Sequence, residues 1–293
     1  MSDPLPFGTI TILGPGLLGG SLAMAVRAAM PAAAIRLWAR REATLQQALD
    51  MGIADAACTD PAEAVRGADL VVLATPIGAF RDLAEQIAPS LAPGAIVTDV
   101  GSVKNYVHRT TGAWLHEQGH TFIGSHPMAG SEKQGLEAAY PELFRGASIV
   151  LTNDHAAPEH TVDRLRQFWE LLGGRCYLME SKHHDRTVAR ISHMPHVLAA
   201  LCAYSATRGD VRMHDLQSLA ATGFRDTTRV CSGSPSMWTD ILWENDCAIR
   251  EILHTCLDDL TELIRLLEIQ DKETLHTWLE QARDNRETII GGQ

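Results

Sequence analysis

The chain has 293 residues with 25 Lys and Arg against 36 Asp and Glu, a formal net charge of −11. This acidic balance argues against a nucleic-acid-binding protein, because phosphate contacts need clustered basic side chains. The length is comfortable for two domains, and six cysteines without a CxxC pair or a recognisable signal peptide indicate a cytoplasmic protein with reduced thiols.

The first 180 residues alternate between strand-like and helix-like segments. Residues 9–13 form a β-branched run that ends at glycines, and an Ala- and Leu-rich helix is predicted over 17–30. Further strands are predicted at 35–38, 70–74 and 95–99, with helical patterns between them. Such alternation indicates a parallel, doubly wound sheet. Two later strands are expected to extend the same sheet, at residues 148–151 and 176–178.

Strand signals end near residue 181. Apolar residues from Ile249 to Leu267 then recur three and four positions apart, which predicts one long amphipathic helix. We therefore expect an α/β fold with two parts. A Rossmann-type dinucleotide-binding domain is predicted over residues 1–180, and an all-helical domain for substrate binding and dimerisation over residues 181–293.

A glycine motif, Gly14-Pro15-Gly16-Leu17-Leu18-Gly19, connects the first predicted strand to the first helix. In dinucleotide-binding folds the first glycine forms the tight turn, the second lets the backbone approach the pyrophosphate, and the third lets helix and strand pack closely. The helix N-terminus then offers unpaired N–H groups to the phosphates. The flanking strands favour a cofactor site over a chance glycine turn. The predicted cofactor-binding residues here and after the third strand are Gly14, Gly16, Leu17, Leu18, Gly19, Thr75 and Pro76.

The end of the second strand carries the signal for cofactor choice. An NAD enzyme keeps a carboxylate there, which accepts from the ribose 2′-hydroxyl, but this chain has Ala39 followed by Arg40 and Arg41. Arginine binds phosphate through its planar fork of donors. We therefore predict a preference for NADP over NAD. The alternative is that both arginines are solvated and that both cofactors are used.

Two segments carry the candidate catalytic residues. Residues 99–104 (DVGSVK) follow the fourth strand, at the carboxyl edge where ligands bind in such sheets. His126 follows another short apolar run, in a loop flanked by glycines. Histidine is the usual general base because its pKa lies near neutrality. Proton transfer is one interpretation of His126, and a structural role is the other.

With these segments the chain resembles the prephenate and arogenate dehydrogenase family. The resemblance runs through GPGLLGGSLA, DVGSVK, HPMAGSEKQG, HDRTVARISHMPH and GFRDTTRV followed by PSMW, in that order. It implies an NAD(P)-dependent enzyme of tyrosine biosynthesis that converts prephenate to 4-hydroxyphenylpyruvate by oxidative decarboxylation. It also implies a homodimer formed through the helical domain. Ala221-Thr222 stand where the family often has more glycine, which leaves the exact wall of the pocket open.

The resemblance also implies roles for single residues. His126 would take the proton of the substrate's C4 hydroxyl, and Ser102 would orient both groups. Arg229 would bind the ring carboxylate, with Glu132 in an ionic network around it. His196 would contact the substrate side chain, and a neutral imidazole donor suits the keto group of prephenate better than the ammonium of arogenate. Other pocket positions implied are Ser192, Gly223, Asp226 and Trp238.

Three alternatives stay open at this point. An arogenate or dual-specificity cyclohexadienyl dehydrogenase is the nearest of them. A β-hydroxyacid dehydrogenase would need a catalytic lysine in the helical region, where Lys182 is the only lysine between Lys133 and Lys272. A non-catalytic dinucleotide-binding protein is disfavoured by the joint presence of four site residues, which are Ser102, His126, His196 and Arg229.

No metal, nucleic acid or membrane partner is expected. Four histidines lie close in sequence, but no carboxylate or cysteine pattern completes a metal motif; they are His183, His184, His193 and His196. His184-Asp185 belongs to a segment that carries the resemblance and is interpreted as support for helix packing or for the site. The apolar stretch 14–34 contains four glycines and Arg27, which disfavours a membrane span. Little sequence follows the helical part, so any control by tyrosine is expected to act at the active site.

Overall fold

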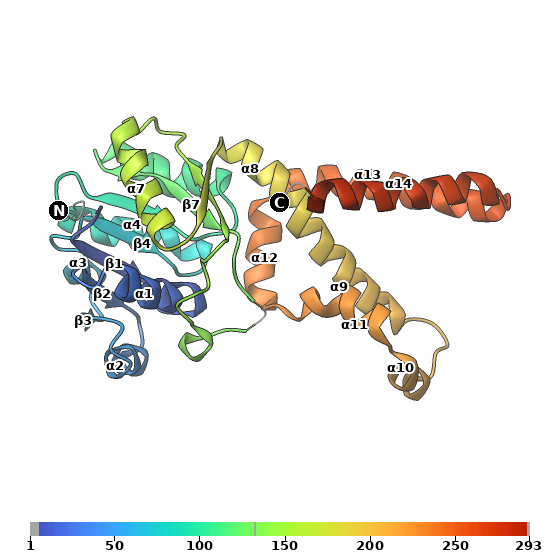
Figure 1. The fold of residues 1–293 in the computed structure, drawn as a ribbon, viewed down its shortest axis with the longest axis horizontal. Coiled ribbons are helices and arrows are strands. Elements are labelled where there is room, and N and C mark those ends of the chain that lie inside the picture. Colours follow the sequence, from blue (N-terminus) through green and yellow to red (C-terminus); the bar gives the residue numbers. More distant parts are fainter. Residues whose placement is uncertain (1–5, 132, 292–293) are drawn as a thin grey trace. The chain divides into compact units, whose positions relative to one another are not determined.

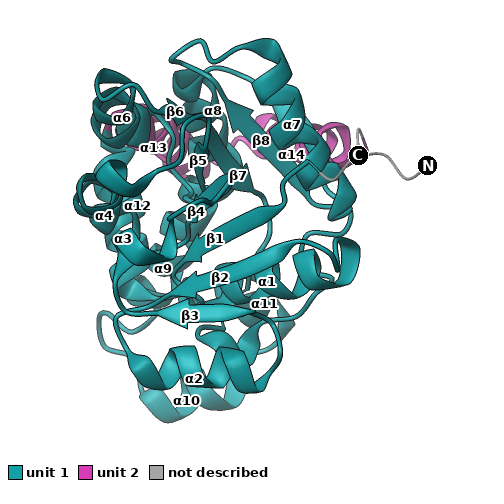
Figure 2. Ribbon diagram, turned by 90° about the vertical axis from the view of Figure 1, so that its left-hand side faces the viewer, with its two compact units in different colours: residues 1–246 teal, residues 247–293 magenta. Residues whose placement is uncertain are grey.

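The computed structural model describes residues 6–131 and 133–291, and the chain forms two compact units (Figure 2). Unit 1 spans residues 1–246 and unit 2 spans residues 247–293. The strands of the described chain all belong to unit 1, whereas unit 2 is helical. Every predicted site residue except Glu132, which lies outside the described residues, is in the described part of unit 1.

A six-stranded parallel sheet forms the centre of unit 1 (Figure 2). Its order, β3-β2-β1-β4-β5-β6, reverses direction between β1 and β4, as in dinucleotide-binding folds. The apolar, β-branched composition of the central strands suits burial on both faces. The strands are β1 (Thr9–Leu13), β2 (Ala34–Trp38), β3 (Ala56–Cys58), β4 (Leu70–Leu73), β5 (Ile96–Asp99) and β6 (Thr121–Phe122).

Helices connect these strands and cover the sheet. The first begins directly after Gly16, and its side chains Leu22, Ala23 and Val26 are fully buried in the core. The α-helices before residue 175 are α1 (Leu17–Ala29), α2 (Glu42–Asp50), α3 (Pro61–Ala64), α4 (Phe80–Ile87), α5 (Asn105–Val107), α6 (Ala113–Glu117) and α7 (Glu159–Leu171). Short 3-10 or π-helical turns are η1 (Ile77–Ala79), η2 (Ala88–Ser90), η3 (His108–Gly112) and η4 (Leu136–Ala138).

The prediction that residues 148–151 and 176–178 extend the central sheet is wrong. They form β8 (Ser148–Thr152) and β9 (Arg175–Leu178), which belong to a separate three-stranded sheet with β7 (Gly124–Pro127). β7 is antiparallel to β8, and β9 is parallel to it. Strand propensity marks a segment as extended, but tertiary context selects its partner. The short strands β3, β6 and β7 were not anticipated either.

From residue 181 the described chain is helical, as expected, apart from its connecting turns (Figure 1). α8 (Ser181–Val188) continues through a π-helical turn, η5 (Ala189–His193), into α9 (Met194–Ala206). This turn ends just before Pro195, which has no N–H for the α-helical bond. Unit 1 is completed by α10 (Met213–Leu219), α11 (Thr222–Thr228), η6 (Arg229–Ser232) and α12 (Pro235–Glu244).

Unit 2 consists of two long helices, α13 (Asp246–Glu268), whose first residue still belongs to unit 1, and α14 (Lys272–Gly291). α13 contains the apolar stripe predicted from Ile249 to Leu267, so that prediction is confirmed. Among the residues that the structure describes, no helix combines the length and apolar character needed to cross a membrane.

Candidate active site

The glycine turn between β1 and α1 has the backbone geometry of a dinucleotide site. Gly14 has a φ of +110°, and a Cβ there would approach the Ala74 carbonyl oxygen to 2.8 Å. A Cβ on Gly19 would collide with the Gly14 carbonyl, whereas one on Gly16 would meet no atom within 4 Å. The first and third glycines are therefore needed for packing, and the second leaves the backbone open to a pyrophosphate.

The other predicted cofactor residues lie around this turn. Leu17 and Leu18 are the first residues of α1 and are half-buried. Thr75 follows β4 beside the turn, since a Cβ on Gly14 would come within 2.9 Å of the Thr75 methyl carbon. Pro76 is exposed next to it. The structure thus brings these residues together at the carboxyl ends of β1 and β4, where the strand order reverses.

Arg40 and Arg41 lie between β2 and α2, and both side chains are exposed. Arg41 directly precedes α2, and Ala39, before the two arginines, is buried. Within residues 6–131 and 133–291, neither guanidinium forms an ion pair. Both arginines are therefore available to an anionic ligand at the end of β2.

His126 lies inside β7, not in a loop as expected, and is 7% exposed. The neighbouring Ser125 ties this strand to β5, because its N–H donates to Asp99 Oδ1 at 3.1 Å and its hydroxyl lies 2.7 Å from Thr98 Oγ1. Trp169 Nε1 donates to the same hydroxyl at 3.1 Å. These bonds hold His126 beside the carboxyl end of β5, the edge where ligands bind in such sheets.

A buried ion pair fixes the loop after β5. Lys104 Nζ contacts Asp99 Oδ2, and both side chains are 0% exposed. Asp99 also accepts the N–H groups of Gly101 at 2.9 Å and Ser125 at 3.1 Å. Burial raises the pKa of Asp99 and lowers the pKa of Lys104, while their mutual attraction opposes both effects. Because removal of either partner would leave a buried charge unpaired, the loop that carries Ser102 is strongly held.

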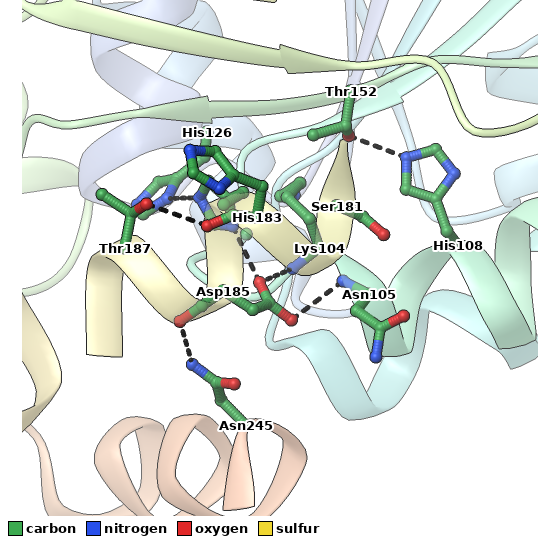
Figure 3. Close-up of polar contacts among 12 residues, drawn as sticks. Lys104, Asn105, His108, His126, Thr152, Ser181, His183, Asp185, Thr187 and Asn245 are labelled. Carbon is green, nitrogen blue, oxygen red and sulfur yellow. Dashed lines mark hydrogen bonds and ion pairs between the residues drawn. The ribbon is translucent and has the colours of Figure 1, made fainter. Parts of the chain in front are cut away.

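His126 ends a hydrogen-bonded chain of side chains that begins on α8. His126 Nδ1 lies 2.7 Å from His184 Nε2, and His184 Nδ1 lies 2.7 Å from Asp185 Oδ1. Asp185 also accepts the backbone N–H groups of Lys104 at 2.8 Å and Asn105 at 3.0 Å (Figure 3). Both members of this chain on α8 are buried. α8 and the loop after β5 are thereby linked through the same carboxylate.

Burial also controls the protonation of these histidines. It lowers the pKa of His126 well below its usual value, and the charge of Lys104, together with that of His184 and His193 when they are protonated, lowers it further. Burial lowers the pKa of His184 too, against the opposing hydrogen bond and charge of Asp185. His126 is therefore neutral near pH 7, which is the state that a general base needs.

A second group of rings lies on η5, α9 and α12. His196 and Trp238 are stacked, with ring centroids 3.5 Å apart and an interplanar angle of 10°. His193 meets the same indole edge-on at 6.0 Å. Asn245 donates to the Asp185 carbonyl at 2.9 Å (Figure 3) and lies 3.1 Å from His193 Nδ1. The ring group is therefore connected to the chain of side chains that ends at His126.

Two nitrogens of this ring group are buried without a hydrogen-bond partner among the described residues. They are His193 Nε2 and His196 Nδ1. Buried polar atoms in proteins are normally paired with protein or water, so both nitrogens are candidates for contact with a ligand. Burial lowers the pKa of His193 to about 4 and also lowers the pKa of His196.

The remaining predicted residues are brought together less completely. Ser102 is half-buried, and within the described chain no hydrogen bond joins it to His126, whose Nδ1 partner is His184. Ser192 is half-buried in the π-helical turn. Gly223 is exposed on α11.

Arg229 and Asp226 belong to the segment after α10. Asp226 is exposed on α11, and Arg229 is exposed at the start of η6. The backbone of Val230, next to Arg229, hydrogen-bonds His196. The arginine backbone therefore lies near the ring group of α9 and α12.

Comparison with known proteins decides what this arrangement is. The nucleotide-binding domain of prephenate dehydrogenase matches residues 22–178, and the dimerization domain of prephenate dehydrogenase matches residues 180–281. The chain belongs to the prephenate dehydrogenase family. It is an NAD(P)-dependent oxidoreductase of that family, and the resemblance and the Rossmann-plus-helical fold predicted from the sequence are confirmed.

Three relatives illustrate the range of this family. The chain is 34% identical to the cyclohexadienyl dehydrogenase of Zymomonas mobilis over 281 residues, which cover 96% of this chain and 95% of that protein. Prephenate dehydrogenase from A. aeolicus, solved with hydroxyphenyl propionate and NAD+, matches with a TM-score of 0.90 and 28% identity over 99% of this chain and 100% of that one. Synechocystis arogenate dehydrogenase matches with a TM-score of 0.82 and 34% identity over 96% and 99% of the two chains.

The candidate site contains residues that the sequence left without a catalytic or binding role. Lys104 and Asn245 were not assigned, and His184-Asp185 was interpreted only as support for packing or for the site. The signal was present, because both residues of that pair lie in the HDRTVARISHMPH segment that carries the resemblance. Sequence alone does not tell which of several neighbouring histidines faces His126, since that depends on the direction in which α8 packs.

Proposed function

We propose that this enzyme oxidises and decarboxylates prephenate with His126 as the general base. The observation that carries the proposal is the buried imidazole of His126 at the carboxyl end of β5, which His184 holds and whose own pKa burial lowers, favouring the neutral form. NAD(P)+, when bound at the glycine turn, supplies the acceptor for the hydride that leaves C4. His126 takes the C4 hydroxyl proton during this oxidation. After CO2 leaves C1 and its electron pair restores the aromatic ring, His126 returns that proton to the phenolate oxygen.

Substrate binding is assigned to residues of the loop after β5 and of the helical segment. Arg229 would bind the ring carboxylate through a charge-assisted bidentate contact, and its neighbour Val230 already contacts His196. The unpaired nitrogens of His193 and His196 support contact with the substrate side chain. Ser102 would orient the C4 hydroxyl. The other proposed pocket positions are Ser192, Gly223, Asp226, Trp238 and Glu132.

Dual use of prephenate and arogenate is the second candidate, and one contact favours it. Burial lowers the pKa of His196, and the hydrogen bond to the Val230 backbone opposes this lowering, so the ring donates to the Val230 carbonyl. Because Nδ1 has no partner, this donor is Nε2, and a neutral ring then presents Nδ1 as an acceptor. An acceptor suits the ammonium group of arogenate, whereas a donor suits the keto group of prephenate.

NADP is the proposed preferred cofactor. The support is the exposed pair Arg40 and Arg41 at the end of β2 and the absence of a carboxylate at Ala39. One relative was solved with NAD+, so both cofactors belong in the assay. Steady-state kcat/KM for prephenate and arogenate, each with NAD and NADP, tests the whole proposal. Turnover of prephenate with NADP as the better cofactor is expected, and no turnover of either substrate would refute the activity.

A cytoplasmic homodimer with a domain boundary at 180/181 is also proposed. The family match to a dimerization domain over residues 180–281 supports the helical region as the interface. Exposed apolar side chains on α13, including Leu257, Ile264 and Leu267, are consistent with it. The six cysteines are free, as suits a reducing compartment. Light scattering after gel filtration should give twice the mass of the 31.9 kDa chain.

A further inference from the structure

We propose that His184 and Asp185 are positioning residues that set the tautomer of His126, so that its Nε2 atom carries the lone pair that receives the substrate proton. The proposal rests on the function proposed above, because it concerns how the general base of that reaction is prepared. It is carried by the two 2.7 Å contacts that join His126 Nδ1 to His184 Nε2 and His184 Nδ1 to Asp185 Oδ1.

The carboxylate of Asp185 determines which nitrogen of His184 carries the hydrogen. Asp185 Oδ1 already accepts the Lys104 backbone N–H at 2.8 Å, and Oδ2 accepts the Asn105 backbone N–H at 3.0 Å. An ionised carboxylate has no donor, so the nitrogen that faces it must carry a hydrogen. His184 Nδ1 therefore bears its proton toward Asp185.

The tautomer of His184 then determines the tautomer of His126. A neutral imidazole has one donor nitrogen and one acceptor nitrogen, so His184 Nε2 is the acceptor. The facing nitrogen, His126 Nδ1, must be the donor, and the other nitrogen of His126 is left unprotonated. Burial, which lowers the pKa of both rings, supports the neutral forms near pH 7. This relay of hydrogen bonds, which runs from Asp185 through His184 to His126, thus places the lone pair on His126 Nε2 before substrate binds.

The same contacts explain how the charge formed in the reaction is stabilised. When His126 accepts the hydroxyl proton it becomes an imidazolium, and its Nδ1–H remains hydrogen-bonded to His184 Nε2. The negative charge of Asp185 is one hydrogen bond farther along the chain. Hydrogen bonds to charged groups are shorter and stronger than neutral ones, so this arrangement stabilises the protonated base more than the neutral one.

Asn245, the residue that follows α12, supports the relay. Its side-chain amide donates to the Asp185 carbonyl at 2.9 Å (Figure 3) and lies 3.1 Å from His193 Nδ1. Asp185 is therefore held from the loop after β5 through its carboxylate and from the end of α12 through its backbone. A residue bonded on both sides has little freedom to rotate away from His184, which is the requirement for fixing a tautomer.

A pair of substitutions at His184 separates hydrogen bonding from space filling. Glutamine in His184→Gln can accept from His126 Nδ1 through its carbonyl and donate to Asp185 through its amide, whereas His184→Met can do neither. We expect kcat to fall by up to about 10-fold in His184→Gln and by about 10²–10³-fold in His184→Met, within the usual contribution of a general base. KM for prephenate and the Kd for NADP should change less than about threefold in both variants, because His184 is proposed to act through His126 and not on the ligands directly.

The pH profile supplies a readout that a packing role would not move. Loss of the acceptor destabilises the imidazolium of His126, so the acidic limb of kcat should shift to lower pH in His184→Met but not in His184→Gln. The charged and titratable groups around His126 are the same in both variants, namely Lys104 and Asp99 near β5, Asp185 on α8 and His193 on η5. Asp185→Asn, which removes the charge, should shift the same limb in the same direction.

His108→Met is the matched control. His108 is another buried histidine of unit 1, and its Nε2 is hydrogen-bonded to Thr152 Oγ1 at 2.7 Å and not to the relay. It should lower the thermal midpoint but leave kcat within about threefold. Equal kcat and equal acidic limbs in His184→Gln and His184→Met would overturn the relay, since His184 would then only fill space.

A measurement on the wild-type enzyme keeps the proposal testable if a variant fails to fold. Nitrogen-15 spectra of the histidine rings at pH 7 distinguish the two tautomers, with resonances assigned through His126→Gln and His184→Gln. We expect a protonated Nδ1 and an unprotonated Nε2 on His126, and the opposite tautomer would reject the relay. If wild type did not turn over prephenate, the proposed function would fail, while the spectra would still decide the relay.

Discussion

The two sides of the candidate site differ in how much of their geometry the chain supplies by itself. On the proton-transfer side, Asp99, Lys104 and His184 are fully buried. The carboxylate of Asp185, next to His184, is held by two backbone N–H groups. On the carboxylate-binding side, Asp226 and Arg229 are exposed on the short elements α11 and η6. If these residues have the roles proposed above, the difference teaches that the base is held in place before substrate arrives, whereas the substrate anchors lie on an exposed segment.

The largest expected effect comes from the proton-transfer side. His126→Ala should lower kcat by about 10²–10⁴-fold, the usual contribution of a general base. The Kd for NADP should change little, because the glycine turn lies on other elements. Stopped-flow or steady-state kinetics with prephenate, together with a cofactor titration, measure both quantities. His183→Ala, an exposed histidine on α8, is the control and should retain wild-type kcat. A His126→Ala enzyme with more than about half of the wild-type kcat would rule out the role of this residue.

The carboxylate-binding side should respond through substrate capture. Arg229→Ala removes a charge-assisted hydrogen bond of roughly 1.5–3 kcal/mol, which corresponds to about a 10–100-fold loss in kcat/KM for prephenate. The loss should appear mainly in KM. Arg212→Ala, which removes a surface arginine paired with Asp215, is the control and should leave kcat/KM unchanged. An unaltered kcat/KM in Arg229→Ala would mean that another residue binds the ring carboxylate.

The sequence predicted the proton-transfer side in part. The alternation of strands and helices placed β1, β2, β4 and β5 correctly, because buried parallel strands have a strong apolar signal. It missed β7, whose residues Gly124-Ser125-His126-Pro127 have little strand propensity. The strand exists because Ser125 is bonded to β5 and because β8 pairs with it, and both causes are tertiary.

Site residues were predictable only where they belonged to a motif. His126 and Ser102 were expected to contact each other, but the structure gives His126 a partner from α8 that is 58 residues away in sequence. Such a contact follows from the packing of α8 against the loop after β5, which periodicity does not reveal. The glycine turn was predictable in full, since its constraints are local to the backbone.

A third and smaller effect concerns the cofactor, at the exposed arginines between β2 and α2. The double variant Arg40→Ala, Arg41→Ala should reduce the NADP-to-NAD ratio of kcat/KM by about 10-fold, because exposure and salt screen the charged contact. Arg66→Ala changes another exposed arginine of unit 1 and should leave the ratio unaltered. A wild-type enzyme that favours NAD, or a double variant with the wild-type ratio, would show that these arginines do not bind the 2′-phosphate.

The smallest effect is on the free energy of unfolding. Its dependence on pH should come from the buried histidines and not from the exposed ones. Burial lowers the pKa of His193 and His108 to about 4 in the folded protein, against an ordinary value of 6.5. Between about pH 4 and pH 6.5, each of these histidines binds a proton in the unfolded chain but not in the folded chain. The stabilisation is therefore complete above about pH 6.5, falls as the pH is lowered, and is lost at about pH 4.

Urea unfolding at pH 7.5 and pH 5.5 measures this linkage. Each of the two histidines should cost about 1 kcal/mol of unfolding free energy at the lower pH, and His126 and His184 should add to the loss because their pKa values are lowered as well. His108→Met removes one titrating group and should show a correspondingly weaker dependence on pH. An unchanged dependence in this variant would mean that His108 is protonated in the folded protein or neutral in both states. His214→Ala on α10 removes an exposed histidine outside the buried group and is the control, for which the dependence should stay as it is in wild type.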